Sequence, residues 1–132
     1  MIKPMILSMI LADNYYRDTH SGKGVIAGTF NSIRASKFPT RLNFAVFIAL
    51  TDVATSGTVT LEIRNEQTPR KIELPPWNIQ APQDRQAIIE IGGNLRAIPF
   101  ESPGTYEVAV LWNAMEISSR RLTLTPLSQE KK

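Results

Sequence analysis

Residues 42–50 read Leu-Asn-Phe-Ala-Val-Phe-Ile-Ala-Leu, and the alternation in this stretch decides the fold class. Large apolar side chains recur at every second position, which is the period of a β-strand with one face turned to a core. The same period returns in residues 59–63 and 106–112. Half-buried antiparallel strands show this pattern, so these three stretches predict strands of an all-β domain.

Proline and glycine divide the rest of the chain into short segments. The nine prolines leave little room for long helices, and strand candidates follow one another at intervals of about eight to twelve residues. Further strands are expected at Met5–Ala12, Val25–Ser32, Lys71–Leu74, Ile88–Ile91 and Met115–Thr125. Trp77 follows Pro75-Pro76 and is expected in a loop. We therefore predict an antiparallel Greek-key β-sandwich, immunoglobulin-like, with about eight or nine strands.

The chain has 132 residues, of which 42% are hydrophobic and 20% charged, a composition typical of a globular protein. This length fits one domain, which we place at residues 1–126, followed by a polar C-terminal tail at 127–132. No apolar run reaches the roughly 18 residues of a membrane span. A cytoplasmic location is the prediction, and secretion stays open because residues 5–12 are apolar.

Counts of reactive residues exclude several activities. With no cysteine and one histidine, the chain has neither a thiol nucleophile nor the ligands of a Cys/His zinc site. His20 lies in a polar segment, and Ser21-Gly22-Lys23-Gly24 lacks the spacing of a phosphate-binding loop and is interpreted as a hairpin turn. We predict no catalytic residue, no metal and no cofactor. An enzyme is the function class that these residues favour least.

The net charge of +3 does not indicate a nucleic-acid partner. Residues 1–50 carry six basic and two acidic side chains, but the basic ones are scattered singly. Nucleic-acid binders instead cluster Lys and Arg on one element. We interpret the excess of basic residues in this segment as part of an ordinary solvated surface.

The chain contains distinctive short motifs at residues 12–14, 21–23, 25–33, 38–39, 98–100 and 103–106. Together these motifs resemble a family of small bacterial β-sandwich proteins that is described only as a domain of unknown function. The resemblance extends from Ile6 to about Leu124 and implies a β-sandwich. It implies no activity, so no functional residue follows from it. Within the last motif, Pro103-Gly104 predicts a turn, and Tyr106 is placed to bond a backbone carbonyl as in a tyrosine corner.

Some predicted strands are apolar on both faces, although a strand of a simple sandwich has a polar outer face. Residues 5–11 show this pattern, and so do the positions opposite the two main stripes, which are Ala45, Phe47, Ala49, Ala109 and Leu111. An outer apolar face marks a partner surface. We predict a homodimer or a protein partner on the sheet bearing Phe47 and Leu111. The alternative is that loops such as 65–87 fold over this sheet.

Aromatic residues outside the stripes support a second function. Tyr15, Tyr16 and Trp77 are candidates for stacking on a sugar or small ligand. Adjacent strand residues point to opposite faces, so one of the two tyrosines is expected to meet solvent or a partner. The leading prediction is a non-catalytic interaction module that binds a protein partner or itself. The alternative is a carbohydrate- or small-ligand-binding β-sandwich.

Overall fold

The protein is described here by a computed structural model that covers residues 3–68 and 70–127. These residues form strands and no helix, as predicted, so none of them belongs to a helix long and apolar enough to cross a membrane. The strands are β1 (Met5–Arg17), β2 (Gly24–Thr29), β3 (Ser32–Ala35), β4 (Thr40–Thr51), β5 (Gly57–Asn65), β6 (Lys71–Glu73), β7 (Trp77–Ile79), β8 (Ile89–Phe100), β9 (Gly104–Trp112) and β10 (Met115–Pro126).

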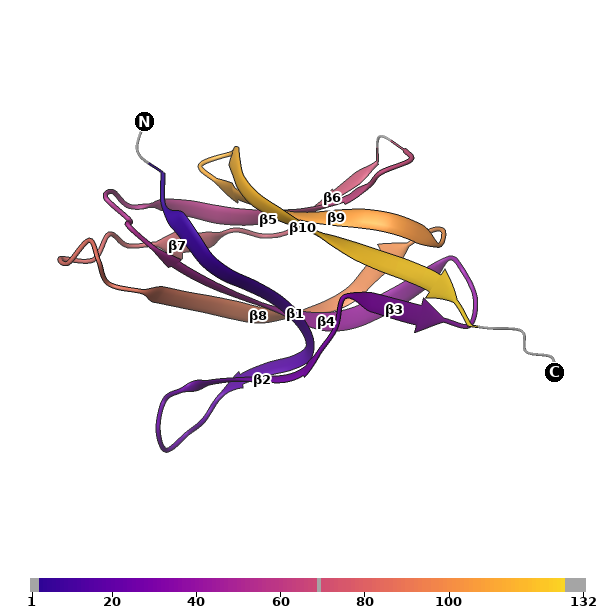
Figure 1. The fold of residues 1–132 in the computed structure, drawn as a ribbon, viewed down its shortest axis with the longest axis horizontal. Helices are drawn as coiled ribbons and strands as arrows, with labels where there is room; N and C mark the ends of the chain where they lie inside the picture. The colour runs from indigo at the N-terminus through magenta and orange to yellow at the C-terminus, as the bar shows by residue number, and fades with distance from the viewer. Residues whose placement is uncertain (1–2, 69, 128–132) are drawn as a thin grey trace.

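The strands form two sheets that lie face to face as two layers (Figure 1). One is four-stranded, in the order β2-β1-β4-β8, and the other is six-stranded, in the order β3-β10-β9-β5-β6, with β7 also paired to β5. All pairs are antiparallel except β3 with β10. The predicted sandwich is confirmed, whereas the specific immunoglobulin-like Greek-key order stays a prediction. The prediction that Trp77 lies in a loop is wrong, because Trp77 is the first residue of β7.

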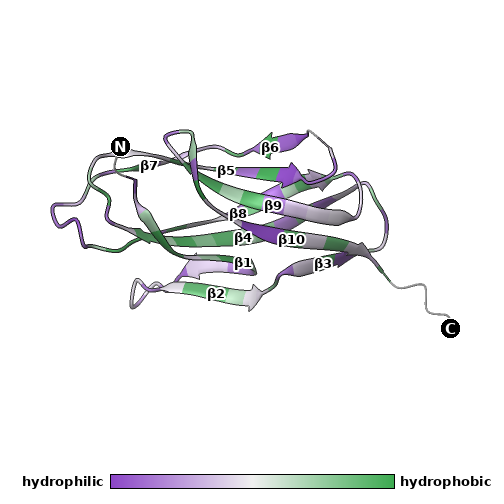
Figure 2. Ribbon diagram, turned by 45° about the horizontal axis from the view of Figure 1, so that its top comes forward, coloured by the Kyte–Doolittle hydropathy of each residue, from purple (hydrophilic) through white to green (hydrophobic). Residues whose placement is uncertain are grey.

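The core lies between the layers and consists of the stripes that the sequence indicates. Phe44, Val46, Ile48 and Leu50 of β4 are at most 1% exposed and face the six-stranded sheet. Figure 2 shows β4 as hydrophobic along most of its length. Opposite them lie the apolar residues of β5, β9 and β10, which include the large buried ring of Trp112. The alternation in the sequence therefore identified the inward faces correctly.

A tyrosine corner closes one end of the core. The Tyr106 hydroxyl donates a hydrogen bond of 2.7 Å to the carbonyl oxygen of Ser102, as predicted. The turn between them contains Gly104 at a φ of 139°, a conformation that other residues rarely adopt. The ring of Tyr106 packs edge-on against Phe100, with 5.0 Å between centroids.

Arg120 joins the two sheets on the side where β10 faces β1. It pairs with Val108 in the β9–β10 ladder, and because Val108 is a core residue, Arg120 also points inward. Its Nη1 donates to the carbonyl oxygen of Met9 in β1 at 2.7 Å, and its Nη2 donates to the Asn31 side chain. A charged side chain thus supplies polar contacts between the layers where the strands leave backbone groups unpaired.

β8 extends well beyond the predicted strand at Ile88–Ile91, since it continues through Gly92 and Gly93. Two glycines rarely lie inside a strand, but rings approach closely here on both of its faces. A Cβ on Gly92 would lie 2.8 Å from the Tyr15 ring, and one on Gly93 would lie 3.3 Å from the Trp77 ring. The glycine pair makes room for both aromatic rings.

β1 has two halves with different partners. Met5–Ala12 pairs with β4, whereas Ala12–Arg17 pairs with β2. The second half of β1 and β2 form a hairpin, here called the arm (residues 13–29). The arm lies against the outer face of the four-stranded sheet and projects away from the body (Figures 1 and 2). Its turn contains the predicted hairpin residues, and the Gly22 amide donates to the Asp18 carbonyl at 2.8 Å.

Candidate functional site

The arm covers the outer apolar face of β4, which the sequence predicts to be a partner surface. Ala45, Phe47 and Ala49 lie on the outer face of β4 and are only 1%, 9% and 7% exposed. The Tyr15 ring of the arm lies 5.9 Å from the Phe47 ring, measured between centroids. For these three residues, the alternative prediction therefore holds: another segment of the chain covers the apolar face. The segment is the arm, however, and not the loops at 65–87.

Polar contacts hold the arm on β8. The Asn94 side chain accepts a hydrogen bond from the Tyr15 amide at 3.2 Å and donates one to the Tyr15 carbonyl at 2.9 Å. Arg17 reaches the carbonyl oxygen of Glu90 at 3.5 Å. Asn94 therefore bonds the arm as a neighbouring strand would, with both its donor and its acceptor. No pattern in a single sequence distinguishes this asparagine from one on an ordinary solvated strand.

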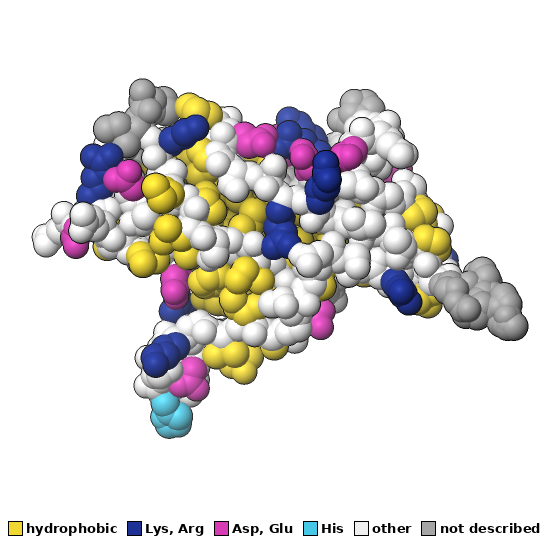
Figure 3. Space-filling model, viewed as in Figure 1, with side chains coloured by type: hydrophobic (Ala, Val, Ile, Leu, Met, Phe, Trp, Pro, Cys, Tyr) yellow, Lys and Arg dark blue, Asp and Glu magenta, His cyan; other side chains and the backbone are white. Residues whose placement is uncertain are grey.

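The tip of the arm contains the only histidine and carries no catalytic grouping. Figure 3 shows the histidine at the exposed end of the projecting arm. Beside it, Asp18 accepts a hydrogen bond of 2.7 Å from the Ser21 amide, and this bond lowers the pKa of Asp18 below its ordinary value of 3.8. Because the folded pKa is the lower one, the contact favours the turn at neutral pH. It is lost as the pH falls through the lowered value.

Ala109 and Leu111 lie on the outer face of the other sheet. They belong to β9 in the six-stranded sheet, whereas Phe47 belongs to β4 in the four-stranded sheet. The outer faces of the two sheets point in opposite directions, so the predicted common surface bearing Phe47 and Leu111 does not exist in this structure. Ala109 is fully buried, and Leu111 is half-buried.

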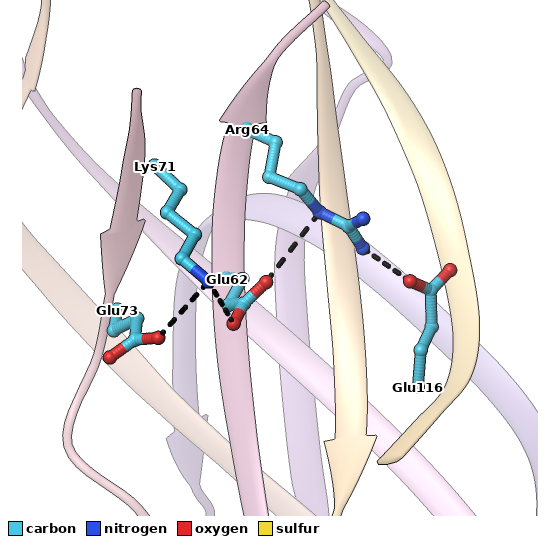
Figure 4. A network of polar contacts seen from close by, with 5 residues as sticks. All are labelled: Glu62, Arg64, Lys71, Glu73 and Glu116. Atoms are coloured by element: carbon cyan, nitrogen blue, oxygen red, sulfur yellow. Dashed lines mark hydrogen bonds and ion pairs between the residues drawn. The ribbon is translucent and has the colours of Figure 1, made fainter. Parts of the chain in front are cut away.

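A network of ion pairs lies beside Ala109 and Leu111 on this face (Figure 4). Glu62 and Glu116 lie opposite them in the neighbouring strands. Arg64 bonds Glu116 at 2.6 Å, and this hydrogen bond is the main reason why the pKa of Arg64 is raised. Lys71 lies 3.4 Å from Glu62. The acids here are paired with basic groups, and this pairing differs from the environment of an acid–base catalyst.

The three candidate ligand aromatics are not brought together. Tyr15 packs on Phe47 under the arm, and Trp77 is half-buried against Gly93 on the opposite face of β8. Tyr16 is 55% exposed, so it is the member of the tyrosine pair that meets solvent, as the strand alternation requires. A stacking platform of several rings is absent from these three positions.

A different group of apolar side chains remains exposed on the four-stranded sheet. We call Met5, Leu7 and Ile88, which are 56%, 46% and 61% exposed, the apolar patch. Met5 lies opposite Thr51 of β4, and Ile88 precedes Ile89, which packs against the core, so Ile88 faces outward. Figure 3 shows hydrophobic side chains on this face and a hollow between it and the arm. The sequence signal for the apolar patch is the presence of apolar residues on both faces of residues 5–11.

A hollow of about 320 Å³ lies beside the tyrosine corner. It is lined by Ile63, Ile72, Tyr106 and Arg70 among others, and Arg70 is paired with Glu101. Among residues 3–68 and 70–127, no cluster of three or more His, Asp or Glu side chains could hold a metal ion.

Comparisons with known proteins identify the fold and the family. One similar solved structure is the alkylpurine DNA glycosylase AlkC of Pseudomonas fluorescens, bound to DNA containing an abasic site analog. It has a TM-score of 0.50 and 15% identity, over 71% of this chain and 27% of that chain. Another is a β-glucosidase of Erythrobacter marinus, with a TM-score of 0.47 and 16% identity, over 89% of this chain and 15% of that chain.

This chain spans only about a quarter or less of either enzyme, and at these identities the first likeness shows a shared fold alone. No curated protein matches the chain. The sequence model of DUF6941, described as a family of unknown function, matches residues 7–125, which is most of the chain. The chain therefore belongs to the DUF6941 family.

Proposed function

We propose that this domain is a non-catalytic interaction module that binds a protein partner, or a second copy of itself, through the apolar patch. The observation that carries the proposal is the exposure of Met5 and Leu7 on β1 and of Ile88 beside the start of β8, on either side of β4 in the four-stranded sheet. Single exposed hydrophobic residues are ordinary, whereas a contiguous group beside a concave surface is typical of an interaction site. The missing cysteines fit a reducing cytoplasm, and the family resemblance favours a bacterial source.

Lysine at two patch positions is expected to weaken partner binding. Burial of a Met or Leu side chain contributes about 1.5–3 kcal/mol, so M5K/L7K should weaken capture of the partner at least about tenfold. The tagged protein is used to capture partners from a native lysate, and each captured protein is quantified by mass spectrometry.

Met115→Lys is the matched control, because Met115 is 39% exposed but lies on β10 of the other sheet. Capture by this variant should equal that by the wild type. If M5K/L7K retains every protein that the wild type and the control retain, the apolar patch is not the binding surface.

Carbohydrate or small-ligand binding is the second candidate function, and the observation in its favour is the exposed ring of Tyr16. A sugar stacked on this ring should shift its NMR signals, and Tyr16→Phe should keep the stacking face while Tyr16→Ala removes it. Titration of glycans into labelled protein tests this. Unchanged Tyr16 signals throughout the titrations would exclude this ring as the platform.

A further inference from the structure

β8 leaves a long edge of the four-stranded sheet open. Within the part of the chain that the structure describes, β8 pairs as a strand with β4 alone, so its other side presents N–H and C=O groups that no strand pairs. Among these groups, the Glu90 carbonyl is reached by the Arg17 side chain of the arm at 3.5 Å. The other edge strands, β2, β3, β6 and β7, have only three to six residues each. An edge of this length is a template for another strand unless the sequence protects it.

The two halves of β8 differ in this protection. Its second half contains Ala97 at a φ of 55° and Pro99, and both features oppose regular pairing. The first half, Ile89–Arg96, contains no proline, and its register with β4 is regular between Ile89 and Leu95. Its charged residues face outward, away from the core. The first half of β8 is therefore competent to accept a strand.

The charges on this half are self-complementary. Glu90 lies opposite Ala49, on the outer face of the sheet, and Arg96 follows the inward-facing Leu95 and so shares that face. The two lie three residues on either side of Gly93, both are exposed, and neither forms an ion pair with another described residue. A two-fold axis through Gly93 would place Glu90 of each copy opposite Arg96 of the other.

We infer that two copies of this chain join β8 to β8 in antiparallel register about Gly93 and so extend the four-stranded sheet across both. On the outer face, the pairing forms two Glu90–Arg96 contacts. On the inner face, it places Ile91 of each copy opposite Leu95 of the other. Opposite charges and apolar pairs directly across a ladder both stabilise a sheet. This dimer uses the strand edge and not the apolar patch, so it stands independently of the proposed partner binding.

Charge reversal with rescue tests the register directly. Sedimentation velocity from micromolar to several hundred micromolar protein should show a reversible dimer. By symmetry, E90R or R96E alone converts two attractive pairs into two repulsive ones, so each should raise the dimer Kd about tenfold or more. The double variant E90R/R96E restores opposite charges across the axis and should return to the wild-type Kd. R121E, on the outer face of the other sheet, is the matched control and should leave the Kd unchanged.

A cysteine at the axis provides a second measurement. The chain has no cysteine, so a disulfide in Gly93→Cys must join two copies. Residues directly opposite in a ladder have Cβ atoms about 4.5–5.5 Å apart, near disulfide distance. A Cβ at position 93 would lie 3.3 Å from the Trp77 ring, so the ring must shift by a few tenths of an ångström to admit a cysteine. With that shift, Gly93→Cys should cross-link under mild oxidation, and Ser119→Cys, exposed on β10, should not.

Three results would overturn the inference. A protein that stays monomeric at every concentration excludes the dimer. A dimer whose Kd is changed by neither E90R nor R96E excludes this register. A dimer that L7K abolishes and E90R leaves intact would place self-association on the apolar patch. By contrast, failure of M5K/L7K to affect partner capture bears only on the proposed function.

Discussion

Phe47→Ala is expected to release the arm from the four-stranded sheet and to lower the free energy of unfolding by about 3 kcal/mol. Phe47 is 9% exposed because the Tyr15 ring covers it, so truncation removes the apolar surface on which the arm rests. For a chain of this length, the loss corresponds to a decrease in Tm of about 10 °C. Thermal unfolding followed by circular dichroism measures it.

Phe47→Glu should be at least as destabilising, because it places a carboxylate under the Tyr15 ring. Ile88→Glu is the matched control. Ile88 is 61% exposed on the same sheet face, so this variant should stay within about 0.5 kcal/mol of the wild type. In the Phe47 variants, trypsin should also cleave faster after Arg17 and Lys23, which lie in the arm. Equal stability of Phe47→Glu and Ile88→Glu would show that the arm does not cover this face.

Arg120→Met is expected to cost about 2 kcal/mol of folding free energy. Methionine keeps much of the side-chain length but donates no hydrogen bond, so the Met9 carbonyl and the Asn31 side chain each lose a charged donor. Hydrogen bonds to charged groups contribute more than neutral ones, and here they connect the two sheets. Urea unfolding followed by tryptophan fluorescence gives the change, since Trp112 is in the core.

The neighbouring arginine provides the control for this substitution. The Arg121 side chain is 78% exposed and lies 3.7 Å from Glu66 on the solvent side of β10. An exposed pair of this kind contributes little, so Arg121→Met should change stability by less than about 1 kcal/mol. If the two arginine variants unfold at the same urea concentration, Arg120 does not connect the sheets as the structure indicates.

Side-chain alternation was sufficient to predict the inward faces of the strands. The stripe of β4 and the Tyr106 corner are local signals, since each depends on residues close in the chain. Alternation does not say which strands share a sheet, because pairing partners lie far apart in sequence. For that reason Phe47 and Leu111 were assigned to one surface, although they lie on two sheets.

The unpredicted features depend on tertiary contacts. Arginine is a residue type usually found at the surface. Only the pairing of Arg120 with Val108 in the β9–β10 ladder shows that its side chain points inward. Gly92 and Gly93 weaken a strand prediction, but they accommodate the Tyr15 and Trp77 rings. The excess of apolar residues on the outer face was a correct observation. Its β4 residues, Ala45, Phe47 and Ala49, are buried beneath the arm, whereas Ala109 and Leu111 lie beside the ion pairs of the other sheet. The apolar patch is the group that stays exposed.

The contact between Tyr15 and Gly92 tests this central claim most directly. A Cβ on Gly92 would lie 2.8 Å from the Tyr15 ring, so its α-protons should show nuclear Overhauser cross-peaks to that ring and upfield ring-current shifts. A heteronuclear-edited NOESY spectrum of the wild-type protein measures both. Cross-peaks from the Tyr15 ring to Gly92 and Phe47 are the predicted result. A Tyr15 ring without such cross-peaks, and Gly92 protons at random-coil shifts, would contradict the account.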